Sequence, residues 1–323
     1  LGGQEEEEEE ECLAEGGDCR GLREKVSALV LSNDAVWDRE RRREAQGGGV
    51  SSPWAIRGPY LVLCWMLDAL FDGRPVSRFW FLETVARMPY FSYIAMLHLY
   101  ETLGWWRIGA AVKRVHFAEE FNEFHHLLVM ESLGGDARWR DRFLAQHAAV
   151  VYFWVLVLLW AASPTWAYNF SELIEAHAVD TYGEFVDANE DLLRSMPAPL
   201  VARRYYTGGD LYLFDEFQST REPGSRRPRC DTLYDVFCNI RDDEREHVAT
   251  MRECQDPTTL VTSPNAAAAG GTAPVAATVA AVATAVYALD ALEVLDLFEV
   301  FSTTGQVVAD VTRAPLSELA SQI

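Results

Sequence analysis

Two copies of a short motif place a glutamate three residues before a histidine: Glu123 with His126, and Glu244 with His247. In a helix this spacing puts both side chains on one face, where a carboxylate and an imidazole can bind one metal ion. A single copy means little, because glutamate and histidine are common on helix surfaces. The second copy makes a pair of metal sites the more specific interpretation.

A further glutamate precedes each motif in an apolar helical context. Glu83 lies within the stretch FWFLETV before the first motif, and Glu175 lies between the two motifs. A carboxylate among aromatic and leucine side chains is costly to bury unless it is paired or binds a metal. The order glutamate, ExxH, glutamate, ExxH is the ligand set of the carboxylate-bridged di-iron four-helix bundles. We therefore predict an all-α, ferritin-like four-helix bundle that holds two non-haem Fe ions.

Several other residues could take part in this site. Glu172 lies one turn from Glu175 and is the rival ligand. Asn122 and Asp243 each stand directly before the glutamate of a motif. We predict that these two side chains bind the outer N–H groups of the metal-bound imidazoles across the bundle. Tyr182 lies two turns after Glu175 on the same stripe, which predicts a phenol beside a metal carboxylate, suited to oxygen chemistry.

The composition limits the remaining possibilities. The chain has 323 residues, of which 49% are hydrophobic and 12% aromatic, enough to fill a core. Its formal charge of -21 argues against nucleic acid as a partner, because phosphates need a basic surface. We predict three segments: an acidic, largely disordered N-terminal segment at 1–52, a di-iron domain at 53–256, and an Ala-rich, low-complexity C-terminal extension at 257–323 with a short acidic helix.

The connection from about 188 to 231 is rich in proline, glycine and arginine, which predicts a long, mostly irregular segment with positive charge at 221–229. The six cysteines include no CxxC pair, and this predicts free thiols. A disulfide or redox switch among Cys230, Cys238 and Cys254 remains the alternative.

Two stretches are strongly apolar. Residues 59–71 predict a helix too short to span a bilayer, and residues 148–162 predict a longer one that ends at Ser163 and Pro164. The cations and the indole at 138–142 suit a headgroup region. We therefore predict two short helices at the membrane interface, while a transmembrane or a buried core helix remains open for 148–162. For 271–289 a linker is favoured over a second membrane helix.

Four long stretches resemble the plastid terminal oxidases, the chloroplast branch of the alternative oxidase family. They read LETVARMPYFSYIAMLHLYETLGWW, HFAEEFNEFHHLLVMESLGG, SELIEAHAVDTYGEFVDANE and LYDVFCNIRDDEREHVATM, and the resemblance covers about residues 53 to 254. It implies that Tyr182 is the redox-relevant tyrosine and that the quinol pocket involves Arg78, Leu82 and Thr181. The iron ligands that it implies are those already selected by spacing: Glu83, Glu123, His126, Glu175, Glu244 and His247.

Two local features favour the plastid branch over the mitochondrial one. His177 stands where mitochondrial members tend to carry a carboxylate. The interval from Glu175 to Glu244 is 69 residues, whereas the interval from Glu123 to Glu175 is 52, which fits an extra segment before the last helix of plastid members. Both features favour plastoquinol over ubiquinol as the substrate.

The resemblance implies a monotopic enzyme on the stromal side of the chloroplast thylakoid membrane, although no targeting peptide is visible in the sequence itself. It would oxidise plastoquinol and reduce O2 to water without pumping protons, and a homodimer or a higher homo-oligomer is compatible with it. The alternatives are a mitochondrial-type ubiquinol oxidase, a soluble di-iron hydroxylase or desaturase, a ferritin-like iron binder, and a catalytically silent membrane scaffold.

Overall fold

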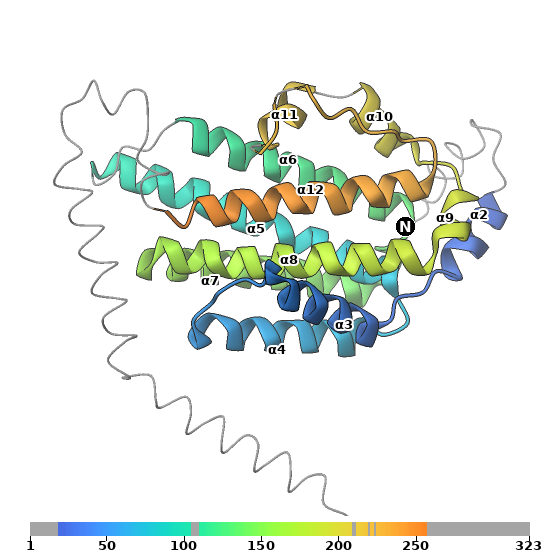
Figure 1. Cartoon of the computed structure of the whole chain (residues 1–323), viewed down its shortest axis with the longest axis horizontal. Coiled ribbons are helices and arrows are strands. Elements are labelled where there is room, and N and C mark those ends of the chain that lie inside the picture. Colours follow the sequence, from blue (N-terminus) through green and yellow to red (C-terminus); the bar gives the residue numbers. More distant parts are fainter. Residues whose placement is uncertain (1–18, 105–109, 209–210, 219, 223, 257–323) are drawn as a thin grey trace, which may run out of the picture. The chain divides into compact units, whose positions relative to one another are not determined.

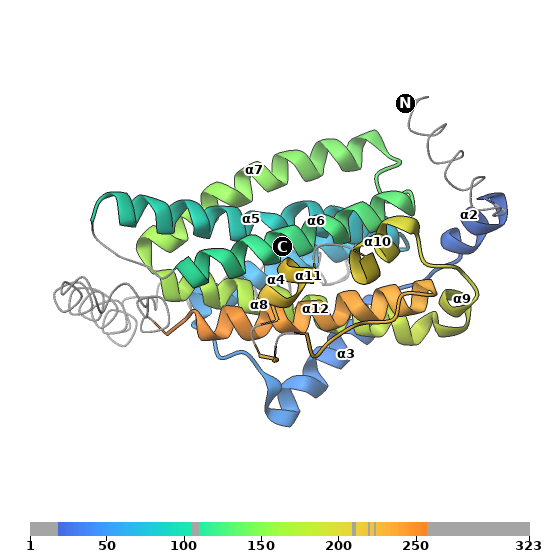
Figure 2. The same ribbon diagram turned by 90° about the horizontal axis from the view of Figure 1, so that it is seen from above.

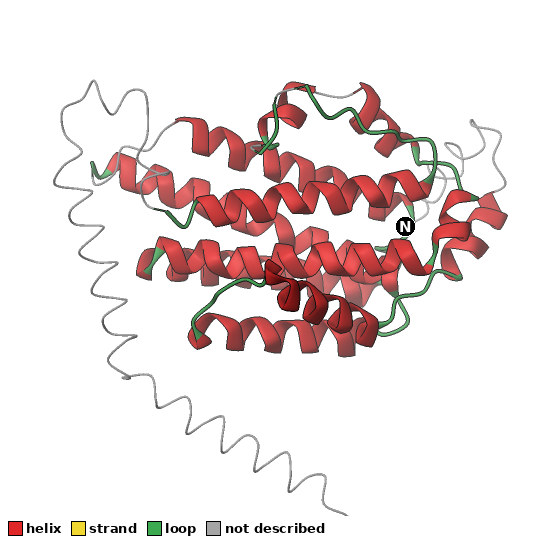
Figure 3. Ribbon diagram, viewed as in Figure 1, coloured by secondary structure: helices red, strands yellow, loops and turns green. Residues whose placement is uncertain are grey.

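The structure, a computed structural model, describes residues 19–104, 110–208, 211–218, 220–222 and 224–256 (Figure 1). The chain divides into two units, Leu1–Thr272 and Ala273–Ile323, and all described residues belong to the first. In these ranges the regular elements are helices, without a strand (Figure 3). The predicted all-α class is therefore confirmed. The predicted extension at 257–323 and the glutamate run at 5–11 lie outside the described residues.

Four long helices form the predicted bundle: α5 (Pro75–Thr102), α6 (Ala110–Ser132), α8 (Pro164–Ala188) and α12 (Leu233–Glu253). Helix α5 packs along α6, and α8 packs along α12 (Figure 1). Local sequence fixes where the second pair begins. Ser163 caps α8 with Pro164 in the first turn, and Thr232 and Asp235 form a capping box at the start of α12.

Two apolar helices, α4 (Trp54–Phe71) and α7 (Trp139–Ala162), pack beside the bundle. Both contribute to one core cluster with α8, which contains Tyr60, Cys64, Leu156 and Phe170. The prediction that these helices are short is wrong. They have 18 and 24 residues, long and apolar enough by length and composition to cross a membrane. Helix α4 begins before Pro59 because the single hydrogen bond lost at that proline, near the helix start, does not end the helix.

Both helices leave a large apolar surface uncovered. The most exposed side chains of α4 include Trp65 at 69%, and those of α7 include Leu158 at 68%, together with Val151 and Trp154. Monomeric soluble proteins rarely expose so many large apolar side chains on neighbouring elements. This surface is therefore a candidate for contact with lipid or with another apolar partner.

The prediction that residues 1–52 are largely disordered is wrong for the part of that segment that the structure describes. Residues 19–48 form α2 (Cys19–Ser27), α3 (Asn33–Arg43) and η1 (Glu44–Gly48), and α3 packs against α8. Trp37 packs against the apolar cluster that includes α8, but much of the contact is polar, which apolar periodicity could not indicate. The buried Glu40 carboxylate accepts hydrogen bonds from Tyr60 and lies 2.8 Å from Nδ1 of His177.

The connection between α8 and α12 is less irregular than predicted. It contains α9 (Glu190–Arg194), α10 (Leu200–Gly208) and α11 (Leu211–Glu216), and the last two lie on α6 (Figure 2). The basic residues at 221–229 follow as a loop. Nearby Cys230 and Cys238 are free thiols, as are Cys64 and Cys254. The free-thiol prediction is thus confirmed for these four, and the disulfide alternative is wrong.

The contact between α3 and α8 gives a testable prediction. Arg43 Nε donates to Asp180 Oδ2 at 2.8 Å, where the carboxylate is 5% exposed. Removing one partner of a charged hydrogen bond leaves the other unsatisfied, so Arg43→Ala should lower the free energy of unfolding by about 1–3 kcal/mol. Arg42→Ala is the control, because Arg42 is exposed and should change stability by less than about 0.5 kcal/mol. Denaturant unfolding measures both changes in the free energy of unfolding. Equal changes for the two substitutions would show that the Arg43–Asp180 contact does not hold α3 against α8.

Candidate metal centre

The six predicted ligands come together inside the bundle, each from the helix that the motif order assigns to it. They form two overlapping groups whose candidate ligand atoms lie within 4.8 Å of one another. One group contains Glu83, Glu123, His126 and Glu244; the other contains Glu123, Glu175, Glu244 and His247. Glu123 and Glu244 belong to both groups. The geometry therefore suits two metal ions that share two carboxylates, with one further carboxylate and one imidazole for each ion.

Several polar atoms of this cluster have no hydrogen-bond partner outside the cluster among the described residues. Glu83 Oε2, both carboxylate oxygens of Glu123, Nδ1 of His126 and both ring nitrogens of His247 have no partner outside the cluster among the described residues. Inside the cluster, Nδ1 of His247 lies 2.9 Å from Oε1 of Glu123. All these atoms are buried, and unsatisfied buried groups of this kind are expensive. Carboxylate oxygen and imidazole nitrogen are the donors that non-haem iron sites use. The donor set and its missing partners fit a pair of iron ions.

Electrostatics also favour a cation here. Burial and the neighbouring Glu123 carboxylate hold the pKa of Glu83 well above its usual value. Burial and the carboxylates of Glu244 and Glu123 do the same for the pKa of Glu175. Burial lowers the pKa of His247, but hydrogen bonding and attraction from Glu123 and Glu244 outweigh it, and the net pKa is raised. The ionised form of these carboxylates is thus unfavourable in a buried space of like charges, and bound metal cations would offset that cost.

Two tyrosines connect opposite sides of the site. Tyr182, predicted to lie beside Glu175, instead donates a hydrogen bond to Glu83, and its ring stacks on Phe79. Tyr90 donates to Glu175 Oε1 at 3.0 Å and was missed by sequence reasoning. Each tyrosine lies seven residues after the glutamate of its own helix and bonds the glutamate of the other helix, because α5 and α8 run antiparallel at this level. The repeated spacing of glutamate and tyrosine is the signal that could have identified Tyr90.

The predicted partners of the two imidazoles are arranged asymmetrically. Asp243 Oδ2 lies 3.1 Å from Nε2 of His126, on the side of the ring that faces away from the cluster. Asn122 does not play the equivalent role for His247, because its amide donates to Asp243 and to Tyr205. Burial raises the pKa of Asp243, yet attraction to Arg226 and hydrogen bonding to His126 outweigh it, so that this pKa lies below its usual value.

Glu172 and the predicted quinol residues lie outside the cluster. Glu172, the rival ligand, pairs with Arg252 at 2.7 Å and accepts from Gln255. The buried Arg78 donates to Asp68 and Asn33, while its Nε and Nη2 have no hydrogen-bond partner in the described part of the chain. The Thr181 hydroxyl donates to His177 O, and Leu82 is partly buried against the core.

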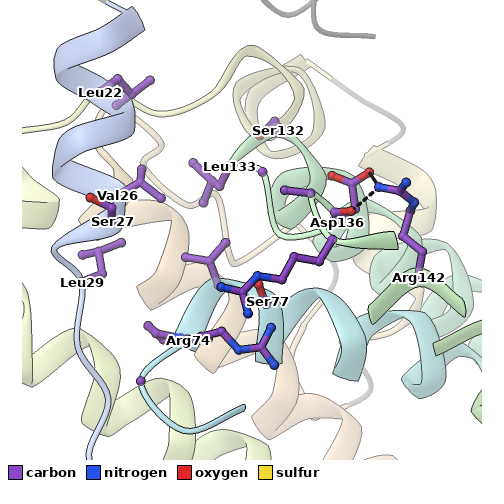
Figure 4. A pocket seen from close by; sticks show the side chains of 16 residues that line it. Leu22, Val26, Ser27, Leu29, Arg74, Ser77, Ser132, Leu133, Asp136 and Arg142 are labelled. Atoms are coloured by element: carbon purple, nitrogen blue, oxygen red, sulfur yellow. Dashed lines mark hydrogen bonds and ion pairs between the residues drawn. The ribbon is translucent and has the colours of Figure 1, made fainter. Parts of the chain in front are cut away.

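A surface pocket of about 510 Å³ lies elsewhere, where α2 meets the turns before α5 and α7 (Figure 4). Leu22 and Val26 form an apolar wall, and Arg74 and Arg142 bring charge to it. None of the predicted iron ligands lines this pocket, nor do the three predicted quinol residues. The pocket therefore does not mark the carboxylate and histidine cluster.

Comparison with known proteins fits the geometry. The sequence profile described as "Alternative oxidase" matches residues 61–256, more than half of the chain. This chain belongs to the alternative oxidase family. It is similar to "Ubiquinol oxidase 4, chloroplastic/chromoplastic" of Arabidopsis thaliana, with 57% identity over 190 residues, 59% of this chain and 54% of the relative. It is 28% identical over 181 residues to "Ubiquinol oxidase 2, mitochondrial" of Glycine max, covering 56% of this chain and 48% of that protein.

The matched region of the alternative oxidase family includes most of α4 and all four bundle helices, and with them every residue of the cluster. Alternative oxidases are di-iron proteins with a ferritin-like bundle, and the buried glutamates and histidines here could hold such a centre. The much higher identity to the chloroplastic relative agrees with the plastid resemblance seen in the sequence. The chain spans about half the length of the curated relatives it matches.

The separation of Glu172 from the cluster gives a prediction for a matched pair of variants on one helix. Glu175→Gln should lower the iron bound per chain, because the amide cannot supply the same charge to the site. Glu172→Gln should leave the iron content unchanged, because its partners are Arg252 and Gln255. Iron analysis of the purified variants measures both. If Glu172→Gln loses iron and Glu175→Gln does not, the ligand set given above is wrong.

Proposed function

We propose that this protein is a membrane-bound, non-haem di-iron quinol oxidase that oxidises plastoquinol and reduces O2 to water. The observation that carries the proposal is the convergence of four buried glutamates and two buried histidines into two overlapping groups that share Glu123 and Glu244. The oxidase names of the relatives in the same family support it. A soluble iron store would need the same ligands but not the uncovered apolar surface of α4 and α7.

In this proposal Glu83 and His126 would hold one iron, Glu175 and His247 would hold the other, and Glu123 and Glu244 would be available to both. When bound, the two irons supply the redox chemistry that passes electrons from quinol to O2. The protein contributes fixed geometry and a buried site with negative charge that favours the oxidised metal.

Tyr182 is the proposed catalytic tyrosine. Its phenol donates to the Glu83 carboxylate and is fully enclosed by the bundle. Burial and the Glu83 carboxylate raise its pKa well above the usual value, so the phenol keeps its proton at neutral pH. A proton held at this atom, beside a predicted iron ligand, is available to oxygen that is being reduced. Tyr90 holds a second proton in the same way, beside Glu175.

Arg78, Leu82 and Thr181 are the proposed quinol-binding residues. The guanidinium of Arg78 has two buried N–H donors without a partner in the described residues, and a quinol oxygen could accept from them. Leu82 directly precedes Glu83, and Thr181 directly precedes Tyr182. A quinol bound by these residues would therefore lie close to the proposed catalytic tyrosine and its carboxylate.

The exposed apolar side chains of α4 and α7 are the proposed membrane contact, in a monotopic arrangement. Because plastoquinol dissolves in lipid, this contact would place the quinol-binding residues near their substrate. The name of the chloroplastic relative supports a chloroplast location, and we extend this to the stromal side of the thylakoid membrane. Charged relays across the bilayer are not part of this arrangement, so the reaction would pump no protons. A homodimer or a higher homo-oligomer would be compatible with it.

Oxygen uptake by membranes that contain the protein tests the proposal, with plastoquinol and ubiquinol analogues compared. We expect uptake with both and a higher kcat/KM for plastoquinol. Glu123→Gln changes a carboxylate shared by both groups, so it should lose iron and reduce oxygen uptake. The reduction should exceed the about 10-fold to 100-fold loss that is typical when a residue that only orients a metal ligand is replaced.

Glu120→Gln is the control on the same helix, because Glu120 bonds Arg87 and lies outside both groups. It should retain iron and uptake. A purified protein that holds two irons and consumes no O2 with any quinol would overturn the proposal. Preference for ubiquinol would instead support the mitochondrial-type alternative.

A further inference from the structure

We infer that Arg226, from the basic loop that precedes α12, is a positioning residue for the metal centre. It fixes the carboxylate of Asp243, which in turn orients the imidazole of His126 toward the metal. The inference rests on the proposed di-iron site and extends it to a segment for which the sequence suggested no role. Three features carry it: the division of contacts at Asp243, the two attachment points of Arg226, and the orientation of His126.

The two oxygens of the Asp243 carboxylate have separate partners. Oδ2 accepts from Tyr206 Oη at 2.7 Å and lies 3.1 Å from both His126 Nε2 and Asn122 Nδ2. Oδ1 is bonded by Nη1 of Arg226. The carboxylate is completely buried. Arg226 therefore supplies both the compensating charge and the contact that holds the second oxygen in place.

Arg226 is anchored at two points on α12. Besides Asp243, it donates from Nη2 to the backbone oxygen of Asn239 at 3.0 Å, one helical turn earlier. Its guanidinium lies 5.3 Å from the centre of the Phe214 ring, and the side chain is only 10% exposed. A planar guanidinium with two donors on one helix fixes direction as well as charge. The loop is thereby tied to the helix that carries Glu244 and His247.

The consequence for His126 follows from its ring nitrogens. When Nε2 donates its proton to Asp243, Nδ1 keeps a lone pair, which is the form that binds metal. Nδ1 faces the cluster, 3.6 Å from Glu83 Oε2, 3.7 Å from Glu123 Oε2 and 3.4 Å from Glu244 Oε1. Without Arg226, Oδ1 would be a buried charge without its partner, and the carboxylate could turn away from His126.

Other cations of this loop have different partners. Arg227 pairs with Asp215, and Arg229 pairs with Asp231, and both arginines are exposed. Neither aspartate bonds a predicted iron ligand. Nε2 of His247 has no hydrogen-bond partner among the described residues. Of the two imidazoles, only that of His126 is therefore oriented by a carboxylate in this part of the chain. Loss of Arg226 should therefore affect the ion beside His126 more than the ion beside His247.

The test compares Arg226→Gln with Arg227→Gln in full-length protein loaded with iron. We measure iron per chain and the rate at which a chelator removes it. Arg226→Gln should release iron about 10-fold faster than the wild type, which is at the low end of the effect seen when residues that orient metal ligands are replaced. One ion should leave before the other. Arg227→Gln should match the wild type, and Arg226→Lys should fall in between, because it keeps the charge but cannot bond both Asp243 and Asn239.

A second comparison, made in protein that already carries Asp243→Asn, distinguishes a positioning role of Arg226 from a general loss of stability. In Asp243→Asn protein, Arg226→Gln should accelerate iron release little further, because both residues act through one contact. In enzyme assays, kcat should fall while the KM for quinol stays unchanged.

Iron release from Arg226→Gln at the wild-type rate would overturn the inference, as would an equal acceleration in the Asp243→Asn background. Wild-type protein unable to hold two irons would instead contradict the proposed metal centre.

Discussion

The structure depends on how four carboxylates can be buried together in the interior of a helical bundle. Glu83, Glu123, Glu175 and Glu244 are at most 3% exposed, and the imidazoles of His126 and His247 are buried among them. Such a concentration of acid is unfavourable in a medium of low dielectric constant unless positive charge offsets it. Two metal ions would supply that charge at the centre. Tyr182 donates a hydrogen bond to Glu83, and Tyr90 donates one to Glu175. Asp243 bonds the imidazole of His126. These three contacts fix the positions of the predicted ligands.

This constraint also accounts for the layers outside the bundle. The Asp243 carboxylate that orients His126 is itself a buried anion, and Arg226 from the loop compensates for it. Helix α3 repeats the pattern on the other side of α8, where Glu40 bonds His177 and Arg43 pairs with Asp180. Polar contacts made by segments outside the four helices thus hold both α8 and α12. The apolar surface of α4 and α7 is left uncovered by the described residues.

The bundle and all six members of the cluster could be predicted from the sequence, because both predictions depend on residue spacing within single helices. Glutamate and histidine three residues apart must share a face, wherever the helix lies. The sequence could not predict which carboxylates belong to both groups, or that Tyr182 bonds Glu83 instead of the glutamate of its own helix, because these depend on how helices align. Glu40 falls in the segment predicted to be disordered, and its partner His177 lies 137 residues away, so nothing in the sequence indicated their contact. Arg226 was one arginine among several in a loop without periodicity.

The central claim is that the two overlapping groups bind two irons side by side. Anomalous X-ray diffraction at the iron edge, from crystals of the iron-loaded protein, tests it most directly. Two peaks should lie inside the bundle, separated by about 3.5–4 Å as in other two-metal sites. One should lie against Glu83 and His126, the other against Glu175 and His247, with Glu123 and Glu244 contacting both. A single peak, or iron found only at acidic groups on the surface, would contradict the account.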